Sequence, residues 1–145
     1  MRQPNAPLPK VPLYQFRNNA GRHCLSTDPD VSKIPLTSDG RWTNQGSLGM
    51  ALTLCMDGSV PLYHLYDGRR HLFTTSDAEK RSESSFRDQG IICYVEPTEK
   101  TGTILIRRMA NNSFGDNVYV KKNEIDEQRR WGYSAEDAHY YLYSA

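Results

Sequence analysis

The sequence predicts a mainly β domain built from three similar units. The apolar and aromatic pattern of residues 60–95 recurs at residues 11–27 and, more weakly, near the C-terminus. Trp42, Phe86 and Trp131 are about 44 and 45 residues apart, an internal period typical of repeat proteins. Three β-rich units can bury their apolar faces together around one axis. We therefore expect a single pseudo-three-fold β-trefoil-like domain with short helical insertions, with a three-fold α+β repeat assembly as the alternative.

The central unit carries the clearest pattern, which opens as a hairpin. Residues 60–66 and 71–75 are rich in aromatic and β-branched residues, and Asp67-Gly68 lies between them. Two such runs around an Asp-Gly turn are typical of a β-hairpin.

A helix and a third strand are predicted to follow that hairpin. Ser76 with Glu79 three residues later forms a capping box, which predicts a helix start. We expect Gly90 to end this helix, because glycine adopts the left-handed conformation found at helix ends. Residues 91–95 then form the third strand-like run, before Pro97.

The other two units follow the same plan with local changes. In unit one we expect a loop at residues 28–41, where prolines disfavour a long helix, and a strand at residues 49–55. In unit three, residues 122–130 take the place of the helix, and residues 138–143 form the closing strand. In the alignment of the units, Ile104-Leu105-Ile106 corresponds to Pro61-Leu62-Tyr63.

Short turn-like joints between the units favour one closed domain. The predicted boundaries are a flexible N-terminal arm at residues 1–10 and a single domain at residues 11–145, with repeats at about 11–58, 59–101 and 102–145.

The composition limits the classes of partner and the locations that we expect for the chain. The chain has 145 residues with 18 basic and 17 acidic side chains, and this near balance argues against nucleic-acid binding. It has no apolar run of the roughly 18 residues that a membrane helix needs, so we expect no membrane insertion. The N-terminus lacks the apolar core of a secretory signal, which predicts a cytoplasmic chain, one exported without a conventional signal, or an extracellular one whose signal was removed.

The cysteines and histidines give no pattern of a metal centre. Cys24, Cys55 and Cys93 each lie in a strand-like run, and we expect buried free thiols because no C-x-x-C spacing occurs. The four histidines have no ligand spacing, so we expect neither a metal site nor a cofactor.

The stretch around residues 60–95 resembles a known repeat family of unknown function. Its copies read roughly P-x-Y-R-x-Y-N, then G-x-H-F-Y-T-T-s-x-x-E, then G-W-x-x-E-G-I-x-x-Y-V. The matching positions in unit two are Pro61, Tyr63, Tyr66, Gly68, His71, Phe73, Thr74, Thr75, Glu79, Gly90, Ile91, Tyr94 and Val95. Unit one keeps Pro12, Tyr14, Phe16, Asn18, Gly21, His23 and Thr27, and unit three has lost most of the pattern.

This resemblance implies a module of secreted bacterial and fungal proteins that sometimes lies beside hydrolase domains. Such company suggests attachment to a surface or a glycan. The family brings no established active site, so no catalytic residue is carried over. The Gln-x-Trp signature of ricin-like lectins does not occur.

The residues themselves also favour a carbohydrate-binding, lectin-like module. Sugars stack on aromatic faces, and Asp, Asn, Arg or His then hydrogen-bonds their hydroxyl groups. The hairpins offer this mixture, and we predict shallow binding sites in units one and two, with unit three weak or inactive. The candidate ligand-binding residues are Tyr66, Asp67, Arg69 and His71 in unit two, and Phe16, Asn18, Asn19, Arg22 and His23 in unit one. The alternative for each is that it holds its hairpin together.

Catalysis is not expected, because no G-x-S-x-G, P-loop, H-E-x-x-H or dinucleotide fingerprint occurs. We therefore predict a non-enzymatic protein whose partners are glycans or a glycosylated surface. The first alternative is a protein-binding module such as a protease inhibitor, with residues 28–41 as the loop that enters the protease cleft. The second is a purely structural repeat.

Overall fold

The structure is a computed structural model that describes residues 7–31, 41–82 and 84–144. Most of the predicted N-terminal arm and most of the loop at residues 28–41 lie outside these ranges. None of the helices in the described ranges has the length and apolar composition needed to span a bilayer.

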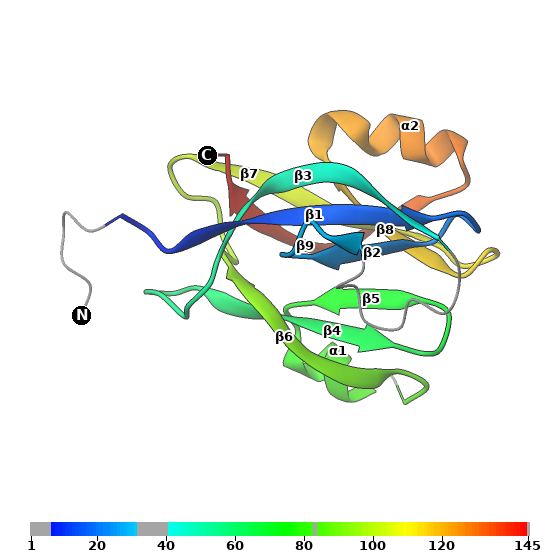
Figure 1. Cartoon of the computed structure of the whole chain (residues 1–145), viewed down its shortest axis with the longest axis horizontal. Coiled ribbons are helices and arrows are strands. Elements are labelled where there is room, and N and C mark those ends of the chain that lie inside the picture. The colour runs from blue at the N-terminus through cyan, green and yellow to red at the C-terminus, as the bar shows by residue number, and fades with distance from the viewer. Residues whose placement is uncertain (1–6, 32–40, 83, 145) are drawn as a thin grey trace.

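The strands of the described residues fall into three successive groups, named repeats one, two and three (Figure 1). Repeat one consists of β1 (Lys10–Asn18), β2 (His23–Ser26) and β3 (Trp42–Leu52). Repeat two consists of β4 (Val60–Tyr66), β5 (His71–Thr74), α1 (Asp77–Ser82) and β6 (Arg87–Val95). Repeat three consists of β7 (Thr103–Asn111), β8 (Asp116–Lys121), the 3₁₀ turn η3 (Lys122–Glu124), α2 (Ile125–Arg130) and β9 (Ser134–Tyr143).

Each repeat is a three-stranded antiparallel sheet with its first strand in the middle. β1 pairs with β2 and β3, β4 with β5 and β6, and β7 with β8 and β9. Single residue pairs, Leu52 with Tyr94 and Met50 with Tyr143, join the repeats into one open sheet. The mainly β class is confirmed, whereas the β-trefoil arrangement is not confirmed.

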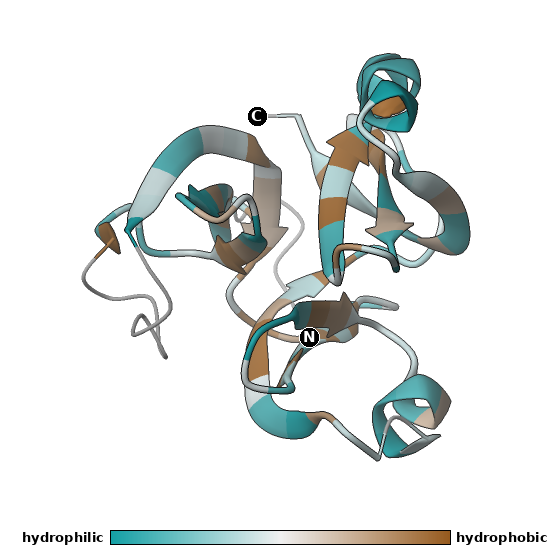
Figure 2. Ribbon diagram, turned by 90° about the vertical axis from the view of Figure 1, so that its right-hand side faces the viewer, coloured by the Kyte–Doolittle hydropathy of each residue, from teal (hydrophilic) through white to brown (hydrophobic). Residues whose placement is uncertain are grey.

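The repeats are arranged as three lobes around a common centre (Figure 2). The second strands β2, β5 and β8 contact one another there. Their side chains and those of the neighbouring strands form a core in which Leu13, Leu62 and Ile106 are fully buried. These three residues each precede the hairpin turn by the same number of positions, so Ile106, and not Leu105, is the equivalent of Leu62. The sequence alignment of repeat three is therefore corrected by one residue.

The hairpins form because the same turn chemistry recurs. The side-chain oxygens of Asn18, Asp67 and Asn111 each accept a hydrogen bond from backbone N–H groups two to four residues later. Asn and Asp stabilise turns in this way because their short side chains can replace a backbone acceptor.

The helix predicted in repeat two forms, but it is shorter than expected. The Ser76 hydroxyl accepts the Glu79 N–H at 3.0 Å, as a capping residue should. α1 ends at Ser82, and Gly90 does not end it: Gly90 lies within β6 with φ +105°. The register of β6 shifts beside Gly90, so this glycine permits a β-bulge.

The exposure of the cysteine and tryptophan side chains corrects two further predictions. Cys24 and Cys93 are buried free thiols as expected, but Cys55 is exposed and follows the end of β3. Trp42 is buried in the core, whereas Trp131 is 69% exposed after α2, so these two residues are not structural equivalents.

Candidate functional site

The best-formed polar site lies at the boundary between repeats one and three. β2 contributes His23, the turn between β7 and β8 contributes Phe114, and the segment between α2 and β9 contributes Trp131 and Tyr133. The backbone N–H of Tyr133 bonds the carbonyl of Gln128, which folds this segment back onto the end of α2. Three chain segments distant in sequence therefore meet at one place.

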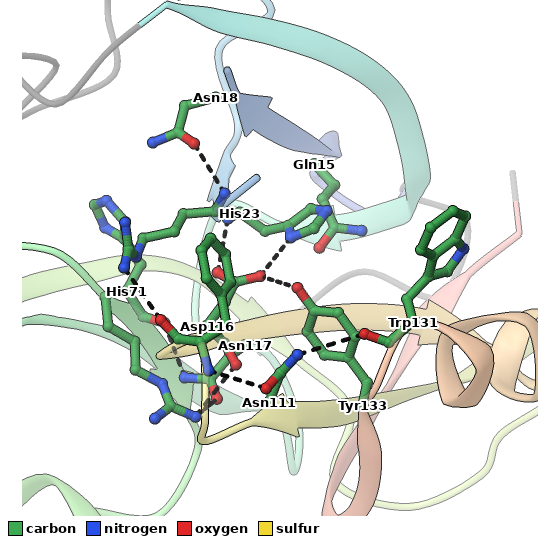
Figure 3. A network of polar contacts seen from close by, with 12 residues as sticks. Gln15, Asn18, His23, His71, Asn111, Asp116, Asn117, Trp131 and Tyr133 are labelled. Atoms are coloured by element: carbon green, nitrogen blue, oxygen red, sulfur yellow. Dashed lines mark hydrogen bonds and ion pairs between the residues drawn. The ribbon is translucent and has the colours of Figure 1, made fainter. Parts of the chain in front are cut away.

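Asp116, fully buried at the start of β8, organises the base of this site (Figure 3). Its Oδ1 accepts the backbone N–H of His23 at 2.8 Å. Its Oδ2 accepts hydrogen bonds from Nδ1 of His23 and from the hydroxyl of Tyr133, both at 2.6 Å. A buried carboxylate needs such donors because it has lost its water shell. Asp116 thus fixes side chains from repeats one and three at once.

This network determines the chemistry that His23 presents. An ionised carboxylate only accepts hydrogen bonds, so Nδ1 of His23 carries the proton directed at Asp116. In the neutral imidazole, the other nitrogen, Nε2, is then an acceptor. His23 also lines the pocket described below, where such an acceptor suits a ligand hydroxyl.

Tyr133 is held as a neutral phenol. Burial raises the pKa of its hydroxyl above the usual value, and the negative charge of Asp116 raises it further. The phenol therefore keeps its proton and donates a hydrogen bond to Asp116. Tyr133 acts as a fixed hydrogen-bond donor to the base of the site.

Above this network lies a pocket of about 460 Å³, a size suited to a small organic ligand. Two large aromatic side chains on it are exposed, Trp131 at 69% and Phe114 at 39%. Among the described lining residues, Arg17 alone carries a permanent charge. The lining residues are Arg17, Ala20, Gly21, His23, Gln45, Asn111, Phe114, Gln128, Trp131 and Tyr133.

Asn111 connects the two exposed aromatic residues. Its Oδ1 accepts the Phe114 N–H at 3.0 Å, and its Nδ2 donates to the Trp131 carbonyl at 3.4 Å (Figure 3). Arg22 adds a second link, because its guanidinium lies 4.6 Å from the centre of the Phe114 ring and donates to the carbonyls of Phe114 and Gly115. The aromatic rim is thus attached to the polar base from both repeats.

The structure places the predicted binding residues of repeat one in different roles. His23 lines the pocket, and Arg22 lies beside it. Phe16 is fully buried in the core, and Asn18 is buried in its own turn. Asn19 is exposed and accepts the Arg41 N–H at 3.4 Å.

The predicted residues of repeat two do not gather at a surface pocket. His71 is fully buried, and Tyr66 is 9% exposed with its hydroxyl donating to the Gly68 carbonyl. Asp67 accepts the N–H groups of its own turn, and Arg69 is exposed beside it. These contacts match the alternative given above, in which the residues hold the hairpin together.

Sequence reasoning missed most of the pocket. It did not select Asp116 and Asn111, because the aromatic residues Trp131 and Tyr133 lie more than a dozen residues further along the chain. Trp131 carried a signal only as a marker of the repeat period, which does not indicate a binding site. Gln45 and Gln128 carried no signal.

A second pocket of about 420 Å³ lies between repeats two and three. Its wall contains Arg108, Glu79 and Glu136, which form an ion-paired cluster with N–O distances of 2.6 and 2.7 Å. Arg108, Glu79 and Glu136 therefore satisfy one another's charges within the wall of this pocket.

Comparison with known proteins places the chain in a family. A family model of a domain of unknown function, DUF5648, matches residues 12–143, which include all three repeats. The chain belongs to the DUF5648 family. The match makes the three repeats parts of one DUF5648 domain, and it does not confirm the resemblance to the repeat family described from the sequence. No match was found among curated proteins or among solved structures.

Proposed function

We propose that this DUF5648 domain is a carbohydrate-binding module whose site is the pocket between repeats one and three. The observation that carries the proposal is the indole of Trp131, which is 69% exposed at a pocket with a hydrogen-bonding base. An exposed indole beside fixed polar groups suits a sugar ring, because its C–H face stacks on the aromatic plane while its hydroxyls find hydrogen-bond partners.

The polar partners match the needs of hydroxyl groups. The carboxamides of Gln45 and Gln128 each offer two donors and an acceptor, and the His23 ring offers a further polar contact. Arg17 adds a positive charge, and no described lining residue carries a carboxylate. The expected ligand is therefore a neutral or acidic sugar, with amino sugars bearing free amines binding less well.

The proposed site differs from the one predicted from the sequence. Repeats one and three form it together, and repeat three supplies both exposed aromatic residues. We expect modest affinity for a single sugar and stronger binding to a surface that presents many copies.

The test is a screen of the purified full chain against immobilised neutral, acidic and amino sugars, followed by titration of each hit in solution. Trp131→Ala should abolish binding while leaving the thermal midpoint unchanged, because the side chain is exposed. Leu54→Ala is the matched control, since Leu54 is also a large apolar side chain, 59% exposed, and does not line the pocket. A folded protein that binds no sugar, or a hit that survives Trp131→Ala, would contradict the proposal.

The same titration has an optical readout. The chain has two tryptophans, of which Trp42 is buried at 7% exposure and Trp131 is exposed. A sugar stacking on Trp131 should change the long-wavelength emission of the exposed indole. Emission that changes equally in the Trp131→Ala protein would contradict stacking at this residue.

A further inference from the structure

A cluster of metal-ligating side chains lies inside the molecule, and none of its residues lines the proposed sugar pocket. His64 of β4, His71 of β5 and Cys24 of β2 are all buried, with exposures of 2%, 0% and 1%. One ligand atom from each lies within 4.8 Å of the other two. The three ligands come from two repeats, so the cluster exists only in the folded domain.

The two histidines are held by stacking between strands. His64 pairs with Phe73 across the hairpin, with ring centres 4.4 Å apart, and His71 pairs with Tyr66 at the same separation. Trp42 and His71 pack in a T-shaped arrangement, with ring centres 5.6 Å apart. Aromatic neighbours on several sides restrict the ring orientations, which is the preorganisation that a metal site requires.

The hydrogen bonding of the cluster is incomplete. Nε2 of His64 and Nδ1 of His71 lie 2.8 Å apart and share one proton. The remaining ring nitrogen of His71, Nε2, is buried and has no hydrogen-bond partner among the described residues. Buried polar atoms in native proteins nearly always have a partner, so an exception of this kind requires an explanation.

We propose that Cys24, His64 and His71 bind a soft, thiolate-preferring metal ion, with Cu⁺ favoured over Zn²⁺. Thiolate and imidazole ligands suit both ions. A structural zinc site needs four ligands, and the described residues supply three. One thiolate and two neutral imidazoles cancel the single charge of Cu⁺, whereas Zn²⁺ would leave a net positive charge in the interior, which is costly.

Binding requires proton movements but no oxidation. The Cys24 thiol releases its proton to solvent as the sulfur–metal bond forms, and the proton between Nε2 of His64 and Nδ1 of His71 ends on a ring nitrogen that does not bind the ion.

The test uses the full chain, reduced and freed of metal, titrated anaerobically with Cu⁺ against the chromogenic chelator bicinchoninate. The starting protein carries Cys55→Ser, which removes the exposed thiol. It should take up one Cu⁺ per chain. Adding Cys24→Ser should weaken binding by more than about tenfold, since even partners of ligands have effects of that size. Adding Cys93→Ser should not, although Cys93 is equally buried.

Two further measurements keep the proposal falsifiable if the Cys24 variant fails to fold. X-ray absorption of the loaded parent protein should show one sulfur and two nitrogen neighbours around copper, and a different ligand set would overturn the site. A parallel titration with Zn²⁺ tests the choice of metal, since tighter binding of Zn²⁺ than of Cu⁺ would overturn the preference for copper. No uptake by the folded parent, or uptake that persists in a folded Cys24→Ser protein, would overturn the proposal.

Discussion

Arg108 of β7 donates two hydrogen bonds to the carboxylate of Glu79 in α1, at 2.9 and 2.6 Å, across the boundary between repeats two and three. A third bond, from its Nε, reaches Glu136 at 2.7 Å. The Arg108 side chain is only 7% exposed, so its charge depends on these partners. The bidentate pair therefore attaches the helix of one repeat to the sheet of the next.

Glu79→Gln should destabilise the fold by about 1–3 kcal/mol at neutral pH, because Arg108 then keeps only Glu136 as an ionised partner. The effect should depend on pH. Burial alone would raise the pKa of Glu79, but hydrogen bonds from Arg108 and Thr74 and the charge of Arg108 lower it overall. A lowered native pKa contributes stability above the usual value of 4.5, and this is lost as the pH falls through the native pKa.

Urea unfolding at pH 7 and pH 3 measures this dependence. The stability difference between the native sequence and Glu79→Gln should be largest at pH 7 and should shrink at pH 3. Glu99→Gln, at an exposed position, is the control and should show little difference at either pH. A difference for Glu79→Gln that does not change with pH would contradict this role of the ion pair.

Tyr119→Phe should lower the free energy of unfolding by about 1–3 kcal/mol, because it leaves two buried backbone groups unpaired. The Tyr119 hydroxyl accepts the Phe73 N–H at 2.7 Å and donates to the Phe73 carbonyl at 3.0 Å. Both residues are buried where β5 approaches β8. Chemical denaturation of the variant gives the loss directly.

Tyr140→Phe provides the matched control for Tyr119. Tyr140 is buried beside Tyr119, with ring centres 6.4 Å apart, but its hydroxyl has no hydrogen-bond partner among the described residues. Removing an unsatisfied buried hydroxyl should leave stability unchanged or raise it. Equal losses for the two variants would show that the ring packing, and not the Phe73 bonds, is what the substitutions disturb.

The sequence predicted the repeat plan because the hairpin signals are local. Asp67 forms its turn with the residues that follow it, and Ser76 caps α1 with a residue three positions away. Gly90 was assigned wrongly because a glycine with positive φ serves a helix end and a β-bulge equally well. The local pattern does not distinguish the two.

The site residues depend on contacts that sequence spacing does not show. Asp116 bonds His23 from 93 positions away, and the pocket forms only when repeats one and three meet. Similarly, Cys24 approaches His64 and His71 across the centre of the molecule, so no ligand spacing could reveal that cluster. Repeat three had the weakest sequence match, but its turns supply the aromatic rim.

The three cysteines should differ sharply in reactivity. Cys55 is exposed, whereas burial raises the pKa of the Cys93 thiol to about 12. At pH 8 the thiolate fraction of Cys93 is then about one part in 10⁴, and the thiolate is the reactive form. A disulfide reagent such as dithionitrobenzoate should therefore modify one thiol rapidly in the native protein and three in denaturant. Cys55→Ser should remove the rapid phase, and a rapid phase that remains would contradict the assigned burial.

Gly49→Ala should be among the most damaging small substitutions in the chain. Gly49 lies in β3 next to Met50, which pairs with Tyr143 of β9 and so joins repeats one and three. A Cβ at this position would lie 3.0 Å from the Leu142 Cβ and 3.0 Å from the Tyr143 carbonyl oxygen. Because one neighbour is backbone, the strands themselves must move, and we expect a loss of about 2–4 kcal/mol from crowding and backbone strain together.

Gly46→Ala separates these two causes. Gly46 lies in the same strand with φ +108°, so alanine is strained there too, but a Cβ at Gly46 meets nothing within 4 Å. The stability loss in Gly46→Ala should come from backbone strain alone and amount to about 1–2 kcal/mol. The excess loss in Gly49→Ala then measures how tightly β3 and β9 are packed. Equal unfolding free energies for the two variants would mean that β9 shifts freely at this contact, and that repeats one and three are held together elsewhere, as by His23 and Asp116.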